Sequence, residues 1–585
     1  MMRQQYHWRS LTLAGFLAFF ALTILVQIIR IQTSPDAAVF KAQAENFSGT
    51  YRTIYPERGE IYDRNGHLLA GNQTVYAVSV NLDEVTDPYA MALTLSTYLA
   101  LDYNETLDYL LDPPEGKHNL TFKDFVPADQ AAALQELQRQ MAVQAAGTGV
   151  PSRLSGLEFQ AHLQRSYPEN ALASNVIGFV SREGRGYFGV EEKYNDLLAG
   201  VPTQVWVPED PNRALEIPKV PDGTTLILTI NRDLQAATEQ ILDDALNQYG
   251  AQNGAIIVMD PKTGEILAMA VTPRMDLNQF WNYDSIYNTA ADYNRAVSMP
   301  YEPGSVVKIL TMAAALDSGT IQPNTSYFDT GVFEVGGIEI QNWDGRPWGT
   351  QDMLGCLQHS LNVCLAWVST SMGRDNFYGY MERFGLGRPT GVDLAGEAAG
   401  RLKVPGDSDW SESDLGTNSF GQGLTATPLQ MIAAASAIAN DGRMVVPHVL
   451  YAMVRNEQQV NIPPALGGSP ITQQTADTLN EMLALSLEQE ASLALLPGYR
   501  LAGKTGTGQI PTPGLGYISD QTNASFIGWG PVDDPQFMIY VWLERPSASI
   551  WGSDTAAPVF SQVAERTVIL LDIPPDSVRQ QLANR

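Results

Sequence analysis

The sequence has few cysteines, few lysines and no excess of basic residues. Among its 585 residues only Cys356 and Cys364 are cysteines. Two cysteines cannot build a disulfide framework, and no CxxC pair or Cys/His cluster is present to bind zinc. The formal net charge is −28, from 36 Lys and Arg against 64 Asp and Glu. This acidity argues against a nucleic-acid partner and against a broadly basic membrane-binding face.

The two cysteines are expected to be small core residues. If one helix covered both, their eight-residue separation would place them about 12 Å apart along its axis, which is too far for a disulfide.

Only one long apolar run stands out. Leu11 to Ile29 carries no charge and is 19 residues long, enough to cross a hydrocarbon core of roughly 30 Å. No small-x-small cleavage pattern follows it, which favours an uncleaved signal anchor over a removed signal peptide or a buried helix. Arg3 and Arg9 before the run nearly balance Arg30 and Lys41 after it. The segment before the run is short and the region after it is large, which favours a cytoplasmic N-terminus and an exported C-terminal region.

The rest of the chain reads as a globular α+β protein of several domains. With 44% hydrophobic and 17% charged residues it is not a disordered chain. A proline-rich stretch from Pro202 to Pro221 suggests a domain border. The patterns predict strands at 75–80 and 224–230, helices at 128–142 and 234–249, and a hairpin over 254–271.

A serine and a lysine carry the first sign of chemistry. Of nine lysines, only Lys308 has a serine, Ser305, three positions before it. Strong helix formers follow, so Ser305 is expected at or beside a helix N-terminus, on the same face as Lys308. A lysine whose pKa is lowered by burial or by a second cation can activate a serine nucleophile. Taken alone, the pair also fits an N-cap serine beside a solvated lysine.

Two later motifs strengthen the catalytic interpretation. Ser360-Leu361-Asn362 offers a hydroxyl to relay a proton and an amide to orient a carbonyl. Lys504-Thr505-Gly506-Thr507 is expected on an exposed strand beside two antiparallel partners, where a substrate peptide could add as a further strand. Lys504 would bring a second positive charge near Lys308, and Gly506 would keep the wall low for the substrate backbone.

Similar short patterns elsewhere are interpreted as structural. Lys262-Thr263-Gly264 lies in the expected turn of the hairpin, before the serine. His359 is not needed as a base when Lys308 is present. Arg58, Gly59, Asp63 and Arg64 could form a partner-binding surface, but a salt-bridged turn at Asn65-Gly66 is the preferred interpretation. Gly421 and Gly423 are expected in a loop against the active site. We therefore expect the residues of these patterns to have structural roles.

In this order the three motifs resemble the signature of penicillin-binding proteins and class A β-lactamases. The segments that resemble class B penicillin-binding proteins outside these motifs are 58–66, 165–180 and 189–200 in the N-terminal part, and Asn294-Arg295-Ala296 and 419–423 in the catalytic part. The resemblance covers nearly the whole chain. It implies a cytoplasmic tail (1–10), a transmembrane signal anchor (11–30), an extracytoplasmic dimerisation-like pedestal (31–215), a transpeptidase domain with a central antiparallel sheet flanked by helices (216–575) and a C-terminal tail (576–585).

The resemblance implies a single-pass D,D-transpeptidase that cross-links peptidoglycan and is acylated by β-lactams, with no cofactor and no metal. Ser305 would attack the D-Ala-D-Ala carbonyl, with Lys308 as base. Ser360 and Lys504 would pass the proton to the leaving amine, and Asn362 would hold the acyl group's amide. The backbone amides of Ser305 and Thr507 would form the oxyanion hole. Thr505, Gly506 and Thr507 would bind the substrate, and the two threonines would bind its terminal carboxylate.

Two other functions remain open at this point. A serine β-lactamase needs a deacylating carboxylate, and Glu412-Ser413-Asp414-Leu415-Gly416 resembles the ExxLN motif of class A enzymes with glycine in place of asparagine. A β-lactam sensor or a silent scaffold is the third possibility. Within class B, the modest pedestal and the C-terminal run favour a septal over a side-wall role. The implied partners are stem peptides, the cytoplasmic membrane, a polytopic membrane glycosyltransferase and division or elongation proteins.

Overall fold

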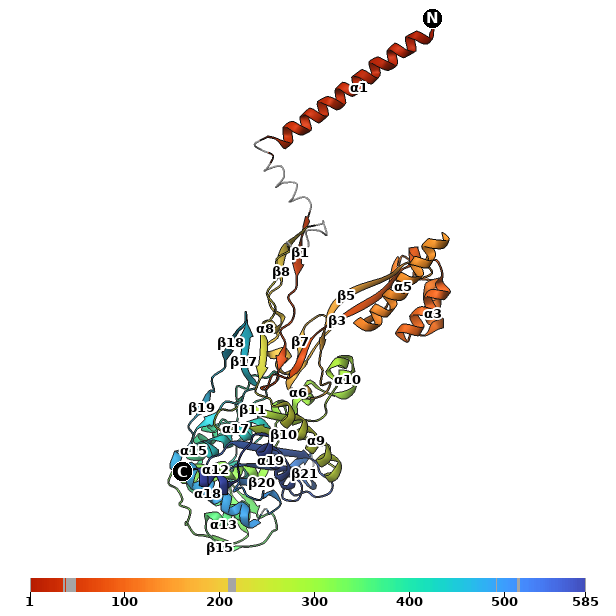
Figure 1. The fold of residues 1–585 in the computed structure, drawn as a ribbon. Helices are drawn as coiled ribbons and strands as arrows, with labels where there is room; N and C mark the ends of the chain where they lie inside the picture. Colours follow the sequence, from red (N-terminus) through yellow and green to blue (C-terminus); the bar gives the residue numbers. More distant parts are fainter. Residues whose placement is uncertain are drawn as a thin grey trace. The chain divides into compact units, whose positions relative to one another are not determined.

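The computed structural model describes residues 2–34, 37, 49–208, 217–490, 492–512 and 516–583. The described chain forms two compact units, one of Met1–Pro56 with Gly200–Asp222 and the other of Glu57–Ala199 with Gly223–Arg585. The predicted domain border at 215/216 and Lys41 lie outside the described residues. Figure 1 shows the ribbon coloured along the sequence.

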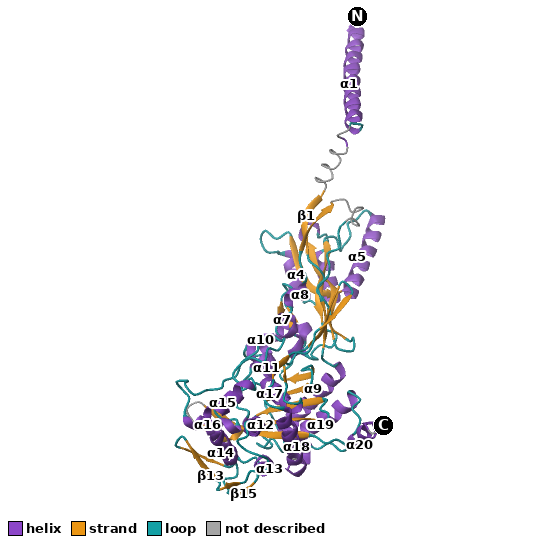
Figure 2. Cartoon of the chain, turned by 90° about the vertical axis from the view of Figure 1, so that its left-hand side faces the viewer, coloured by secondary structure: helices purple, strands orange, loops and turns teal. Residues whose placement is uncertain are grey.

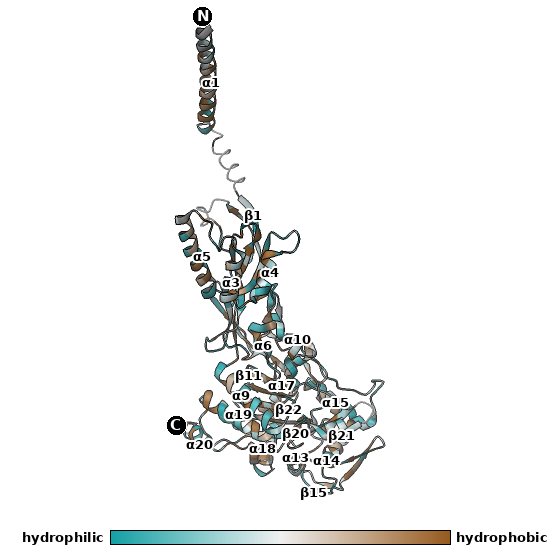
Figure 3. Cartoon of the chain, turned by 90° about the vertical axis from the view of Figure 1, so that its right-hand side faces the viewer, coloured by the Kyte–Doolittle hydropathy of each residue, from teal (hydrophilic) through white to brown (hydrophobic). Residues whose placement is uncertain are grey.

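The first unit carries the long apolar helix. Helix α1 (Met2–Gln32) contains the run predicted to span a membrane, and its segment Trp8–Gln32 is long and apolar enough to do so. None of that segment is buried inside the protein, and much of α1 has the brown colour of hydrophobic residues in Figure 3. The unit also contains an antiparallel pair of strands, β1 (Gly49–Ile54) and β8 (Thr203–Pro208).

In the second unit, one sheet joins the N-terminal and C-terminal parts. Its strand order is β18-β17-β9-β2-β3-β4, with β5 also paired to β3. The strands are β2 (Ile61–Tyr62), β3 (Leu68–Asn81), β4 (Asn119–Pro127), β5 (Leu157–Ser166), β9 (Thr225–Leu228), β17 (Leu450–Arg455) and β18 (Gln458–Asn461). β2 runs parallel to β9, so the two parts share backbone hydrogen bonds. Helices α3 (Pro88–Leu99), α4 (Tyr103–Leu111) and α5 (Ala128–Thr148) pack with β3, β4 and β5 around a small core of their own.

The catalytic part is built on a five-stranded antiparallel sheet with order β11-β10-β22-β21-β20. The strands are β10 (Asn253–Met259), β11 (Ile266–Val271), β20 (Ala502–Thr512), β21 (Gly516–Gly530) and β22 (Phe537–Glu544). The predicted hairpin is confirmed, because Ala255 pairs with Val271 across β10 and β11. β22 pairs with β10 and β21, and nearly all of its side chains are buried.

Helices cover both faces of this sheet, which explains the continuous apolar runs in its central strands. Helices α9 (Arg232–Tyr249) and α19 (Ala556–Leu570) share one core with it, while α12 (Lys308–Asp317), α14 (Asn362–Met372), α17 (Pro428–Ala439) and α18 (Gln473–Glu490) share the other. Figures 1 and 2 show these helices gathered around the sheet. The predicted α+β class, with a central antiparallel sheet between helices, is confirmed.

Local signals explain where the main helices begin and end. Asn231 caps α9 by accepting hydrogen bonds from the amides of Asp233 and Leu234, and Gly250 ends the helix in the left-handed region. At α17, Thr427 and Gln430 form a capping box. The predicted C-terminal tail forms helix α20 (Asp576–Ala583), which begins with Asp576 accepting a hydrogen bond from the Arg500 amide.

Candidate active site

Ser305 lies in a tight turn at the start of a buried helix. The turn is the short 3₁₀ helix η5 (Gly304–Val307), and α12 follows it directly. Ser305 is partly exposed while Val306 and Val307 are fully buried. The sequence prediction of a serine beside a helix N-terminus is confirmed.

Neighbouring segments hold this turn from two sides. The Gly304 amide donates to the Gly421 carbonyl at 3.1 Å. Gly304 has φ +63°, and a Cβ there would lie 2.7 Å from the Thr507 carbonyl oxygen. Because the backbone passes so close, Ser305 is fixed between strand β20 and the loop that contains Gly421.

Lys308 is completely buried and directs its ammonium group to the Ser360 motif. Its Nζ donates to the Ser360 carbonyl at 2.6 Å, to Asn362 Oδ1 at 2.8 Å and to the Ser360 hydroxyl at 3.1 Å. The Nζ also lies 6.0 Å from the centre of the Phe420 ring. A lysine ammonium has three donors, so these three acceptors satisfy it.

Burial also changes the acidity of this lysine. Loss of hydration, and then the positive charge of Lys504, hold the pKa of Lys308 well below its usual value. A larger fraction of Lys308 is therefore neutral near pH 7 than of a solvated lysine. A neutral amine keeps a lone pair that can accept a proton.

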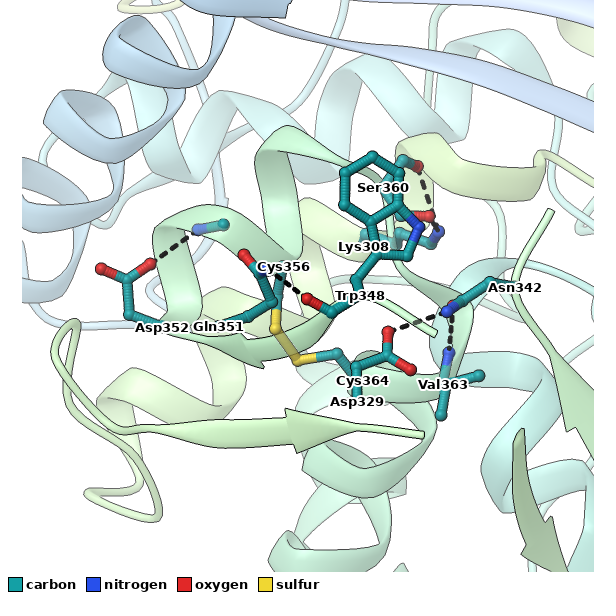
Figure 4. Close-up of a disulfide and its surroundings, with 11 residues drawn as sticks. Lys308, Asp329, Asn342, Trp348, Gln351, Asp352, Cys356, Ser360, Val363 and Cys364 are labelled. Atoms are coloured by element: carbon teal, nitrogen blue, oxygen red, sulfur yellow. Dashed lines mark hydrogen bonds between the residues drawn. A yellow bond between two sulfur atoms is a disulfide. The ribbon is translucent and has the colours of Figure 1, made fainter. Parts of the chain in front are cut away.

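The turn that carries Ser360 joins two helices and is closed by a disulfide. Helix α13 (Met353–Gln358) ends before the motif, and α14 begins at Asn362. Ser360 has φ +51° and reverses the chain between them. As a result Cys356 and Cys364 have Cα atoms 6.0 Å apart and form a disulfide (Figure 4). The expectation of two unpaired core cysteines was wrong, because it assumed one continuous helix.

A buried asparagine that the sequence analysis missed fixes the start of α14. Asn342 is 4% exposed, donates to Asp329 Oδ2 at 2.8 Å and accepts a hydrogen bond from the Val363 amide at 3.3 Å. Figure 4 shows the Asn342 side chain joined by dashed lines to Asp329 and to Val363. The Asn362 side-chain amide donates to the Gln341 carbonyl at 3.1 Å. No short motif marks Asn342, so only the folded chain reveals this support.

Strand β20 carries the Lys504 motif at the edge of the sheet. It pairs with β21, with Lys504 opposite Ile527 and Thr507 opposite Ala524, and it is the last strand in the order. The predicted edge strand with antiparallel partners is confirmed. Lys504 is 5% exposed and its Nζ donates to the Thr505 hydroxyl at 3.1 Å. Thr505 and Thr507 alternate with buried residues and are partly exposed on one face.

The structure gives a different reason for glycine at position 506. A Cβ there would lie 2.3 Å from Ser525 Oγ and 2.8 Å from Val306 Cγ1, so the glycine lets the strand pack against the serine turn. The low wall for a substrate that the sequence analysis proposed is not needed to explain it. Gly508 acts similarly, because a Cβ there would lie 2.2 Å from the Glu302 carbonyl oxygen.

The loop of residues 418–423 closes another side of the site, as expected for Gly421 and Gly423. Gln422 in this loop donates to Gln509 Oε1 on β20 at 3.1 Å, and the Gly423 amide donates to Glu302 at 3.2 Å. Gly421 has φ +83°, and a Cβ there would lie 2.2 Å from the Gly304 carbonyl oxygen. The loop is thus in contact with the serine turn and with β20.

Three residues for which the sequence predicts structural roles, Lys262, His359 and Arg58, make structural contacts. Lys262 lies in the β10–β11 turn, in an ion pair with Asp534. The His359 ring stacks on Trp348 at 4.1 Å between ring centres. Arg58 pairs with buried Glu191 at 2.6 Å.

The ExxLG segment forms helix α16 (Glu412–Thr417), in which Glu412 is exposed. Its Gly416 is buried, and a Cβ at this position would lie 2.5 Å from Ile340 Cδ1. An asparagine, as in the class A motif, does not fit there without movement of Ile340. Among the described residues no group of three His, Cys, Asp or Glu side chains could hold a metal ion.

Comparison with known proteins agrees with this architecture. Residues 254–565 match the penicillin-binding protein transpeptidase domain, and residues 53–213 match the penicillin-binding protein dimerisation domain. The chain is 32% identical to penicillin-binding protein PbpB of Mycobacterium tuberculosis, over 93% of this chain and 82% of that protein. It is 27% identical to peptidoglycan D,D-transpeptidase FtsI of Escherichia coli K12, over 98% of this chain and 95% of that protein.

Solved structures show the same similarity in three dimensions. The crystal structure of penicillin-binding protein 3 from Mycobacterium tuberculosis with aztreonam is similar with a TM-score of 0.68 and 28% identity, covering 90% of this chain and 98% of the other. Penicillin-binding protein 2X of Streptococcus thermophilus has a TM-score of 0.72 at 24% identity, covering 89% of this chain and 80% of the other, and shows the fold alone. The chain belongs to the class B penicillin-binding proteins, with a dimerisation domain followed by a transpeptidase domain.

Proposed function

We propose that this protein is a serine-type peptidoglycan D,D-transpeptidase with Ser305 as the nucleophile. The observation that carries the proposal is the fully buried Lys308, one helical turn after Ser305, with its amine against Ser360 and Asn362. Burial and Lys504 lower the pKa of Lys308, which provides a base three residues after Ser305, whose hydroxyl is otherwise a poor nucleophile. The relatives named peptidoglycan D,D-transpeptidase support the same reaction.

In the first half of the reaction, Ser305 Oγ attacks the carbonyl carbon of the penultimate D-Ala of a donor stem peptide. Neutral Lys308 accepts the hydroxyl proton as the Oγ–C bond forms. The backbone amides of Ser305 and Thr507 donate to the oxyanion. The C–N bond then breaks, and the proton passes through Ser360 and Lys504 to the departing amine of the terminal D-Ala.

In the second half, the amine of an acceptor stem peptide attacks the acyl-enzyme ester. It loses a proton to the same relay, the ester bond breaks, and Ser305 regains its proton. Before acylation, Thr505 and Thr507 bind the terminal carboxylate of the donor. Asn362 holds the acyl group's amide, for which its side-chain NH₂ has a second hydrogen besides the one donated to Gln341.

The hydrogen bonds of Lys308 suggest how one group serves both halves. The Ser360 carbonyl and Asn362 Oδ1 can only accept, so they hold the amine in either charge state. The Ser360 hydroxyl can accept from the ammonium or donate to the neutral amine. Proton transfer can therefore reverse without moving the lysine.

We also propose the domain borders and topology that the sequence indicates. Residues 1–10 would be cytoplasmic and 11–30 transmembrane, with a pedestal at 31–215, a transpeptidase domain at 216–575 and a terminal segment at 576–585, all extracytoplasmic. The long apolar helix within α1 supports the anchor. Substrates would be lipid-linked or nascent peptidoglycan strands.

A septal role and a set of partners complete the proposal. The modest pedestal and the C-terminal run of the sequence favour a septal role over a side-wall role. A polytopic membrane glycosyltransferase contacting the single span and division proteins contacting the pedestal are the expected partners.

The deciding experiment compares the full chain in detergent with Ser305→Ala after addition of a fluorescent penicillin, by gel and by intact mass. We expect a stable adduct on the wild type and none on the variant. A label that disappears as the antibiotic is hydrolysed would indicate a β-lactamase. No adduct on a folded wild type would refute Ser305 as the nucleophile. A stable adduct without cross-linking of lipid-linked peptidoglycan would indicate a sensor.

A further inference from the structure

Helix α3 of the dimerisation domain exposes large apolar side chains. Its Met91 and Leu95 are fully buried in the small core that α3 shares with α4 and α5. On another face, Tyr89 and Leu93 lie about one helical turn apart and are 59% and 60% exposed. The helix carries no charged residue at all. Adjacent apolar side chains that stay in solvent indicate a surface for contact with another molecule.

Helix α4, which packs against α3 in the same core, adds a surface that is both apolar and acidic. Its Tyr109 and Leu111 are largely exposed, Leu111 by 51%. These two side chains line an open hollow of about 610 Å³ together with Glu105, Asp108 and Asp112. Among the described residues, the three carboxylates take part in no ion pair. The hollow therefore combines apolar surface with negative charge that has no cation beside it.

The segment that contains both helices is strongly acidic. Residues 81–122 contain eight Asp and Glu against one Lys and no Arg. The ion pairs of this segment lie before α3, where Asp83 pairs with His118 at 2.9 Å and Asp87 with Arg153 at 3.6 Å. The carboxylates of α4 are left to attract a positively charged partner.

Lysine and arginine side chains suit such a surface. Their methylene stems pack on apolar groups while their charged ends reach nearby carboxylates. A helix with apolar side chains on one face and Lys or Arg beside them would cover Leu93 and pair with the α4 carboxylates. Anionic lipid headgroups would be repelled by the same charges. A second copy of this chain in two-fold contact would bring identical acidic residues together.

We propose that α3 and α4 form a docking surface for a basic amphipathic helix of a partner protein. The inference specifies the surface for the pedestal contact that the proposed function expects with division proteins, and it rests on that expectation. Contact with Tyr89 and Leu93 supplies the apolar part of the affinity. The carboxylates of α4 select a basic partner and speed its association.

The test measures binding of two synthetic helical peptides to the full chain in nonionic detergent, by fluorescence anisotropy. Both peptides have leucine along one face, and the other positions are lysine in one peptide and glutamate in the other. We expect the wild type to bind the lysine peptide only. Leu93→Ser should weaken this binding about tenfold, and Asp108→Asn/Asp112→Asn about fivefold. Added salt should weaken the binding of the wild type.

Val460→Ser is the matched control, because Val460 on β18 is 58% exposed and belongs to another part of the chain. Its affinity for the lysine peptide should equal that of the wild type. Peptide that binds to detergent, or to the acidic chain at large, adds the same background to every variant. Only the differences between variants therefore decide the test.

Equal affinity of the wild type and Leu93→Ser, or equal affinity for the two peptides, would overturn the docking surface. Self-association that Leu93→Ser abolishes would also overturn it, by assigning the face to a second copy. Labelling of α3 by a lipid-phase photoreagent in proteoliposomes would overturn it in favour of the membrane. A wild type that binds the lysine peptide but forms no penicillin adduct would refute the proposed acylation and leave the docking surface standing.

Discussion

The Lys308 amine lies 3.1 Å from the Ser360 hydroxyl and 2.6 Å from the carbonyl of the same residue. One residue of the second motif therefore contacts the lysine through both of its oxygens. The carbonyl fixes the position of the amine, and the hydroxyl can exchange a proton with it. In the proposed mechanism, this division of roles makes the charge state of Lys308 the variable that controls acylation.

Acylation should therefore rise with pH as Lys308 loses its proton. The pKa of Lys308 is lowered, so the midpoint of the rise should lie below the ordinary lysine value of about 10.4. Lys504→Ala removes a neighbouring positive charge, which makes the ammonium form easier to keep and moves the midpoint to higher pH. Acylation rates with fluorescent penicillin over a pH series measure both midpoints.

The midpoint, and not the maximal rate, is the informative quantity, because Lys504 is itself proposed to act in the reaction. Lys262→Ala is the control: this lysine belongs to the other Lys-Thr-Gly sequence, in the β10–β11 turn, and is half exposed. Its pH profile should match the wild type. A midpoint for Lys504→Ala that stays in place or moves to lower pH would contradict the electrostatic argument.

The disulfide should stabilise the protein and the Ser360 turn together. It closes a short loop, for which the loss of chain entropy in the unfolded state predicts about 2–3 kcal/mol. We expect Cys356→Ala/Cys364→Ala to lower the free energy of unfolding by this amount and to slow acylation, because Ser360 loses its restraint. Denaturant titration and penicillin labelling measure the two effects.

A reductant separates the disulfide from the two alanine substitutions. Reduced wild type should behave like the double variant, and the double variant should not respond to the reductant at all. Equal unfolding and equal acylation of the oxidised wild type and the double variant would show that the link does not restrain the turn.

The sequence predicts the local structure around the proposed catalytic residues but not the contacts that hold them. Local periodicity acts within a few residues. It predicts that Ser305 and Lys308 lie one helical turn apart, and it predicts the edge position of Lys504. The three motifs were brought together by resemblance to a family, since no local rule relates positions 305, 360 and 504.

The disulfide was missed for a physical reason. Helix α14 begins after Leu361, whose side chain makes no capping hydrogen bond, so no N-cap residue signals a new helix there. The chain reverses at Ser360 in a left-handed conformation that serine seldom adopts. Tertiary contacts from Lys308 and Asn342 stabilise this turn, and they come from distant segments. The same holds for Trp343 and Trp551, whose rings make an edge-to-face contact although no sequence pattern connects them.

Gly421→Ala should displace the serine turn. At φ +83° a side chain is already unfavourable, and its Cβ would also lie 2.2 Å from the Gly304 carbonyl oxygen. We expect a loss of about 1–3 kcal/mol in stability from the strained backbone and slower acylation as Gly304 moves. Gly396→Ala is the control, because Gly396 has φ +81° with nothing within 4 Å of the added carbon. If Gly421→Ala and Gly396→Ala lower the free energy of unfolding equally and neither slows acylation, the contact between Gly421 and Gly304 does not position the serine turn.

The buried ion pairs around Glu191 test the structural interpretation of the Arg58 segment. The Glu191 side chain is fully buried and accepts hydrogen bonds from Arg58 Nε and Arg165 Nε, both at 2.7 Å. Glu191→Ala leaves two nearly buried guanidinium groups without this carboxylate, which should cost about 3–5 kcal/mol of stability. The control is Glu183→Ala, which removes an exposed glutamate eight residues earlier in the chain, and thermal unfolding of the two variants measures the difference. A Glu191→Ala protein that melts with the wild type would favour the partner-binding interpretation of Arg58, since the segment would then contribute little to the fold.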